Sequence, residues 1–134
     1  MAKAKLTAKE QLSREIAKAK RERWEAMFLQ QLAAILPVGW KRIYQFERQF
    51  QFDHVRKWKL DFAFKLLLLA VEIEGLQPPW LYSRHTTNKG FTEDCRKYAE
   101  AMLQGWTVGR FTGQMVQSGE AIRWTEKVLA RLAS

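Results

Sequence analysis

Three acidic residues lie within two short apolar segments, where a charged side chain is costly. Asp61 lies in the run 58–64, and Glu72 and Glu74 lie in the run 68–74. Both runs alternate as strands do, and strands adjacent in sequence pair as a hairpin, so we expect Asp61 to lie close to Glu72. Carboxylates crowded in apolar surroundings repel one another unless a cation neutralises them. The large residues expected to share the opposite face of the first run are Trp58, Leu60, Phe62 and Phe64.

Oxygen ligands of this kind suit Mg²⁺ or Mn²⁺. Such a cation polarises a phosphoryl oxygen, lowers the pKa of a bound water and stabilises the leaving oxygen, which together hydrolyse a phosphodiester. The alternative is that the three acids simply line the wet face of a half-exposed sheet, because alternation commonly puts acids two residues apart.

The charge of the chain points to a polyanionic partner. Lys and Arg number 23 against 14 Asp and Glu, a formal net charge of +9, which favours nucleic acid. The longest apolar run, 66–71, is too short to span a bilayer, and the N-terminus is charged throughout. We therefore expect no membrane partner and a soluble protein of the cytoplasm. Cys95 is the only cysteine, which excludes an internal disulfide and predicts a small packed residue.

The spacing of apolar residues predicts an α/β chain that places these acids on a central sheet. A helix over 7–36 precedes strands at 44–52, 58–64 and 68–74, with a turn near 65–67. A loop over 75–90 leads to a helix with one packed stripe, then a strand at 106–111 and a helix from Ser118. That stripe comprises Phe91, Cys95, Tyr98, Ala99 and Met102.

The first helix is basic in its first half, and we treat 1–36 as an extension to a single domain at 37–134. A solvated helix face or a homodimer arm is one interpretation of the charge. A clamp on the DNA backbone is the other.

Several motifs resemble those of the PD-(D/E)XK nuclease superfamily. The segments 58–64 (WKLDFAF) and 70–75 (AVEIEG) are similar to its core motifs. Further segments resemble small phage and prophage nucleases related to very-short-patch-repair-like endonucleases: RHT at 84–86, GF at 90–91, DC at 94–95, KY at 97–98, GW at 105–106 and RFT at 110–112. The likeness covers roughly 44–119 and implies a restriction-endonuclease-like core, a mixed sheet flanked by helices.

By position, the resemblance implies that Asp61 and Glu72 bind the metal, assisted by the main-chain carbonyl of Ile73. Glu47 matches the upstream acid of the family. The chain departs from the pattern at Glu74, where the superfamily most often has a lysine that positions or activates water. The resemblance implies that Lys97, on the following helix, supplies that charge, while a plain surface lysine is the alternative.

The remaining candidates are basic residues and a histidine. His85 could bond the scissile phosphate or shuttle a proton, although a lone loop histidine is often incidental. Trp80 and Tyr82 are candidates for touching bases. The residues expected to bind DNA are Arg84, Lys89, Lys59 and Arg48.

Two functions follow from these residues. The first is a divalent-metal DNA endonuclease, acting on branched, nicked or mismatched DNA as small resolvases and repair nucleases do. The second is a non-catalytic DNA-binding module that keeps the nuclease fold, which the glutamate at position 74 favours. A helical dimer through 7–36 is compatible with both.

Overall fold

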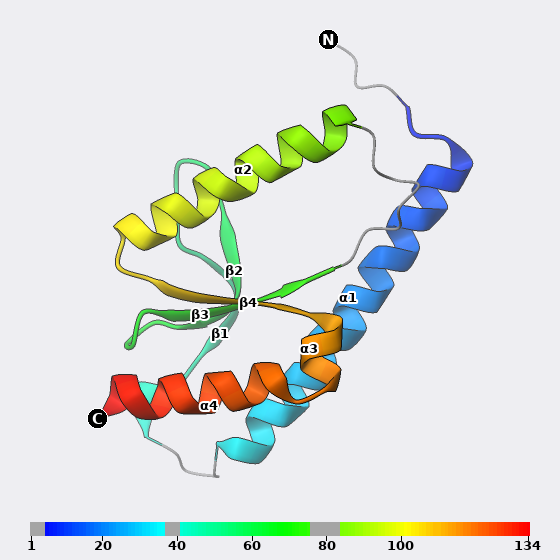
Figure 1. Cartoon of the computed structure of the whole chain (residues 1–134). Coiled ribbons are helices and arrows are strands. Elements are labelled where there is room, and N and C mark those ends of the chain that lie inside the picture. The colour runs from blue at the N-terminus through cyan, green and yellow to red at the C-terminus, as the bar shows by residue number, and fades with distance from the viewer. Residues whose placement is uncertain (1–4, 37–40, 76–83) are drawn as a thin grey trace.

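The computed structural model describes residues 5–36, 41–75 and 84–134, apart from the side chains of 84–88. It is a mixed α/β structure in which helices flank a four-stranded sheet (Figure 1). In chain order the elements are α1 (Ala8–Ile35), a 3-10 turn η1 (Arg42–Tyr44), β1 (Glu47–Gln51), β2 (Lys59–Phe64), β3 (Leu69–Glu74), α2 (Arg84–Leu103), β4 (Thr107–Thr112), α3 (Gly113–Gln117) and α4 (Glu120–Ala133). Within the described ranges, no helix is long and apolar enough to cross a membrane.

The sheet is mixed, with the strand order β1-β2-β3-β4. β1, β2 and β3 pair antiparallel, whereas β4 pairs parallel to β3 after the crossover through α2. The expected β2–β3 hairpin and mixed sheet are therefore confirmed. β3 lies between β2 and β4, and its residues 69–73 are buried, so the sheet places Glu72 at the centre of the molecule.

Alternation along β3 divides the interior into two layers. Leu69, Val71 and Ile73 face a large core that α1, α3 and α4 cover. Ala70 faces a smaller core under α2, which includes Ala101. Glu72 lies two residues after Ala70 and so faces the same side of the sheet. Its carboxylate forms hydrogen bonds with side chains of α2.

α1 begins where the sequence predicts and contributes to the main core. Thr7 caps it, and Glu10 closes a reciprocal capping box with Thr7. Phe28 and Leu32 are fully buried against the sheet, with Phe28 packed edge-on to Phe62 at 5.1 Å between ring centroids. The C-terminal half of α1 therefore packs in the same core as the sheet.

The expectation that the four large residues of 58–64 share one face is wrong. Leu60 packs under α2 together with Trp58, whereas Phe62 and Phe64 pack on the α1 side. The change of face occurs at Asp61, where the pairing of β2 with β3 has ended, so the pleat of β2 is no longer held flat by two neighbours. On the neighbouring strand, Gln49 adopts a positive φ of 52°.

The expected stripe on α2 is also wrong in most of its members. The helix begins at Arg84, inside the expected loop, and Phe91 and Met102 are 69% and 74% exposed. Cys95 is exposed as well. The side toward the sheet carries Lys97, Tyr98 and Ala101, because α2 lies over the acidic residues of β3 as well as over apolar ones.

The C-terminal helix divides in two. A short helix, α3, directly follows β4, and α4 begins at Glu120 after Gly119 takes a left-handed conformation with a φ of 83°. Ser118 ends α3 and accepts a hydrogen bond from the backbone of Glu120 at 3.3 Å.

Two glycine substitutions should have opposite effects on the free energy of unfolding. A Cβ on Gly113 would overlap the indole of Trp24, where α1 meets α3. Gly113→Ala should therefore cost about 1–3 kcal/mol, as overpacking does. A Cβ on Gly90 in α2 meets nothing within 4 Å, so Gly90→Ala should stabilise by about 0.5–1 kcal/mol through helix propensity. Urea denaturation of both variants measures the two effects, and an unchanged stability for Gly113→Ala would contradict this packing of α1.

Candidate active site

The candidate site forms where β2 and β3 separate. Their pairing ends at the pair Phe62 and Val71, and the next residues outward are Asp61 on β2 and Glu72 on β3. Beyond that point the backbone N–H of Asp61 donates to Glu72 Oε1 at 2.7 Å. The N–H of Ile73 donates to Asp61 Oδ2 at 2.9 Å. Each carboxylate therefore bonds the backbone of the opposite strand, which fixes both acids at the same point between the strands.

A third carboxylate reaches this point from α1. Glu25 is only 5% exposed, and Gln49 Nε2 donates both to Glu25 Oε1, at 3.4 Å, and to Asp61 Oδ1, at 3.1 Å. Burial, and next the negative charge of Asp61, raise the pKa of Glu25 to about 7. Glu25 is therefore partly protonated near neutral pH.

Sequence reasoning missed Glu25, although a signal was present. It lies three residues before Phe28 and seven before Leu32, which puts it on the apolar face of α1. An acid within the core-facing side of an amphipathic helix needs a partner in the interior. Here that partner is the polar cluster around Asp61 and Gln49.

On the other side, α2 supplies two partners to Glu72. Lys97 Nζ lies 2.8 Å from Glu72 Oε2, and the Tyr98 hydroxyl donates to the same oxygen at 2.9 Å. Burial, and then the charge of Asp61, raise the pKa of Glu72, whereas Lys97 lowers it. The structure thus brings Lys97 to the carboxylate edge of the sheet.

Glu74 lines the same groove but has different partners. Arg110 Nε donates to Glu74 Oε1 at 2.8 Å, and the Tyr98 hydroxyl lies 3.2 Å from that oxygen. The guanidinium of Arg110 also lies over the Tyr98 ring, 4.2 Å from its centroid. Glu74 is therefore joined to Glu72 through Tyr98, and the acid that lies beside Asp61 is Glu25.

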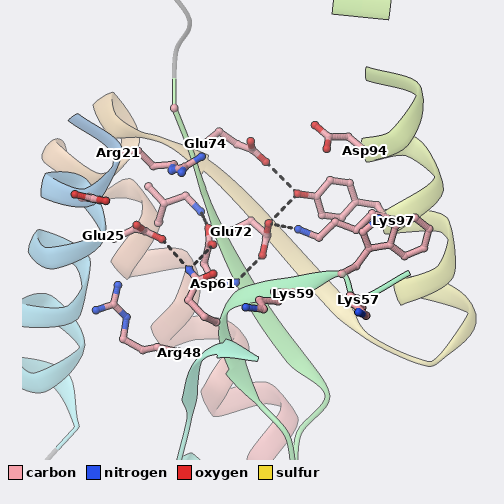
Figure 2. Close-up of a pocket in the computed structure, with 16 residues that line it drawn as sticks. Arg21, Glu25, Arg48, Lys57, Lys59, Asp61, Glu72, Glu74, Asp94 and Lys97 are labelled. Atoms are coloured by element: carbon pink, nitrogen blue, oxygen red, sulfur yellow. Dashed lines mark hydrogen bonds and ion pairs between the residues drawn. The ribbon is translucent and has the colours of Figure 1, made fainter. Parts of the chain in front are cut away.

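Cations surround this acidic centre. The groove has a volume of about 830 Å³ and is open to solvent. Figure 2 shows Arg21 and Arg48 on the side of Glu25, and Lys57 and Lys59 beyond Asp61. All four cationic side chains are on exposed residues. A polyanion lying across the groove would thus meet positive charge on both sides of the carboxylates.

The other expected site residues fall in several places. Arg48 and Lys59 line the groove, and so does Ile73. Glu47 does not: it forms an ion pair with Lys65 at 2.7 Å, and the acid that approaches Asp61 comes from α1 instead. Lys89 is exposed on α2 and is outside the groove lining.

Four expected contacts cannot be placed. The side chains of Arg84 and His85, in the first turn of α2, are outside the described residues. Trp80 and Tyr82 are also outside them.

Asp61 and Glu72 are the acids of the groove that could hold a divalent cation. Among the described residues, no set of three or more Asp, Glu, His or Cys side chains stands in metal-binding geometry. Mg²⁺, however, is usually bound through one or two carboxylates and retains several waters. Asp61 and Glu72 offer such a pair, and burial together with mutual repulsion raises the pKa of Glu72 and of neighbouring Glu25. A cation between these groups would relieve that repulsion.

Comparison of the chain with protein-family models, with curated sequences and with solved structures finds no match. The function is therefore inferred from the residues and geometry of the groove.

The raised pKa of Glu25 predicts a pH-dependent difference in stability between the wild type and Glu25→Gln. The folded pKa is about 7, above the value of about 4.3 for a free glutamate. Folding therefore favours the protonated acid, and the wild type should lose stability as pH rises from about 4 to about 7. Glutamine cannot ionise, so Glu25→Gln should be the more stable protein at pH 8 in the absence of divalent cations.

Thermal melts at pH 4.5 and pH 8 measure this difference, which should shrink at the lower pH because Glu25 is then protonated. Glu47→Gln is the matched control, since Glu47 is half exposed and paired with Lys65. A Glu25→Gln variant that is less stable than the wild type at pH 8 would contradict the assignment of Glu25 as a destabilised acid.

Proposed function

We propose that this chain is a divalent-metal-dependent DNA endonuclease that hydrolyses phosphodiester bonds. The observation that carries the proposal is the pair Asp61 and Glu72, held together where β2 and β3 part. Exposed basic residues lie on both sides of that pair, where they could bind phosphates. Metal-assisted phosphodiester hydrolysis requires acidic residues that bind a divalent cation and basic residues that bind the phosphates.

The fold supports the resemblance to the PD-(D/E)XK superfamily. That resemblance implies a mixed sheet flanked by helices, with an aspartate and a glutamate on adjacent strands. Asp61 on β2 and Glu72 on β3 have this relation, and the segments that carry the motifs form the central strands. We therefore assign the sheet and its helices to a restriction-endonuclease-like core as part of this proposal.

Asp61 and Glu72 would hold the cation, with the main-chain carbonyl of Ile73 as the further ligand that the resemblance implies. When bound, Mg²⁺ or Mn²⁺ supplies Lewis acidity toward the phosphate and lowers the pKa of a coordinated water. Glu25, whose pKa is raised to about 7 when no cation is bound, is our candidate for the group that accepts a proton from that water.

Lys97 takes the part of the lysine missing at position 74. Its ammonium contacts Glu72 at 2.8 Å with a side chain only 16% exposed, so its position is well defined. It orients the Glu72 carboxylate and adds positive charge beside the phosphate site. Glu74 itself is neutralised by Arg110, which keeps its charge from opposing that of Lys97.

A non-catalytic DNA-binding module is the second candidate, and one observation favours it. Both oxygens of Glu72, and both of Asp61, already have protein hydrogen-bond donors. A site satisfied in this way has less need of a cation. Calorimetric titration with MgCl₂ and MnCl₂ separates the two, because a pure binder should give no binding heat that depends on Asp61.

Removing the charge of either metal-binding acid should abolish cleavage. Asp61→Asn and Glu72→Gln each keep an oxygen that accepts the backbone hydrogen bond, so folding should persist while cation affinity is lost. Wild type and variants are incubated with duplex, single-stranded, flapped, nicked, mismatched and four-way DNA in MgCl₂ or MnCl₂. We expect metal-dependent products from the wild type and none from either variant.

Glu47→Gln is the control for this experiment, because it removes an acid of β1 that lies outside the groove. It should cut as the wild type does. Cleavage that persists in Asp61→Asn, or wild-type cleavage that needs no divalent cation, would remove the proposed centre. A wild type that binds DNA and never cuts it would favour the second candidate.

Lys97→Met should lower kcat and move the acidic limb of the pH–rate profile to higher pH. Lys97 lowers the pKa of Glu72, so its loss should leave Glu72 protonated over a wider range. The rate should fall by about 10²–10³, the scale of a lost electrostatic contact to the transition state. Lys65→Met, which removes the partner of Glu47, is the matched control. A profile that keeps its wild-type shape in Lys97→Met would show that Lys97 has no influence on the centre.

A further inference from the structure

The side of α1 that faces the sheet changes character along the helix. On a helix of 3.6 residues per turn, Arg14, Lys18, Arg21 and Glu25 fall within an arc of about 60°. The same arc continues into Leu32, which is fully buried over the sheet. One side of α1 is therefore apolar over the core, acidic at the site and basic beyond it.

The basic part of this side is continuous with the groove. Arg21 lines the groove together with Glu25. Arg14 and Lys18 are exposed and continue along the helix from Arg21 toward the N-terminus. Figure 1 shows this half of α1 extending past the strands of the sheet.

Acids also lie on or beside this side. Glu10 bonds the backbone N–H of Thr7 in the capping box at 3.2 Å, Glu25 is buried at the site, and Glu22 lines the groove next to Arg21. Arg14 and Lys18 extend the positive charge along the helix beyond Glu22 and Glu25. Arg14 and Arg21 are about 10 Å apart along the axis at 1.5 Å per residue. That distance is sufficient for three cations to contact successive phosphates of one backbone.

We infer that Arg14, Lys18 and Arg21 form a track that binds the backbone phosphates of duplex DNA as it leaves the groove, so that the enzyme requires double-stranded DNA beside the cut. The inference rests on the proposed function. A duplex is favoured because its phosphates are regularly spaced, as are the cations on a rigid helix. A flexible single strand would first have to be ordered at an entropic cost.

The test compares two triple variants of the full chain. Arg14→Gln, Lys18→Gln and Arg21→Gln together remove the track. Lys9→Gln, Lys20→Gln and Arg23→Gln together remove three exposed cations from the other side of the same helix. Both variants lose the same charge, and glutamine has nearly the helix propensity of lysine and arginine. Circular dichroism should confirm equal helix content.

Binding is measured by fluorescence anisotropy on duplex and single-stranded DNA of one sequence, with EDTA present, over a series of NaCl concentrations. For the duplex, each lost phosphate contact reduces the slope of log K against log salt by about 0.9. The track variant should therefore lose about two to three units of slope, and the control variant less than one. On single strands the difference between the variants should be smaller.

If both variants lost the same salt slope on duplex DNA, the track would be overturned, because the loss would then reflect net charge and not the position of the cations. A wild type that binds no duplex would overturn it as well. If the track variant lost as much salt slope on single-stranded DNA as on the duplex, the preference for a duplex would be overturned. Since EDTA prevents metal-dependent cutting, a track that binds in a protein that never cleaves would uphold this inference while the endonuclease proposal fails.

Discussion

The structure of the site depends on the exchange of hydrogen bonds between Asp61 and Glu72. In a regular hairpin the backbone groups of these positions would pair with each other, but β2 and β3 have separated there and side-chain carboxylates take over. A buried strand N–H without a partner is costly, so the separation is tolerated because each acid serves the opposite strand. The sheet is thereby opened at its centre, and two negative charges are fixed at the opening.

Two helices contact this opening from opposite sides, and they bring side chains of opposite charge to it. α2 brings Lys97 and the Tyr98 hydroxyl to Glu72, which offsets part of its charge. α1 brings Glu25, which adds to the charge and keeps its pKa near 7. The folded chain thus carries electrostatic strain in its interior, which is typical of sites where stability is given up for function.

Much of this arrangement could be predicted from the sequence, because it follows from local alternation. The strands that carry Asp61 and Glu72, their pairing and the long first helix all depend on patterns within a few residues. The change of face at Asp61 could not be predicted, because it follows from the loss of pairing between β2 and β3. The stripe on α2 was misplaced because the helix lies on polar groups, so that Phe91 and Met102 are left exposed. Glu47 was assigned through the resemblance. Glu25 was missed because patterns within a strand or helix say little about which side chain crosses between layers.

The first helix contributes to the main core and to the acidic centre at once. Phe28 and Leu32 complete the main core, and Glu25 on the same side lies beside Asp61. A straight helix transmits a rotation along its whole length, so a change in the packing of Phe28 would also move Glu25 relative to the acids of the sheet. Any basic residue on that side is placed by the same packing. The core and the acidic centre are therefore coupled through the rotation of α1, and the proposed basic track would be coupled to both in the same way.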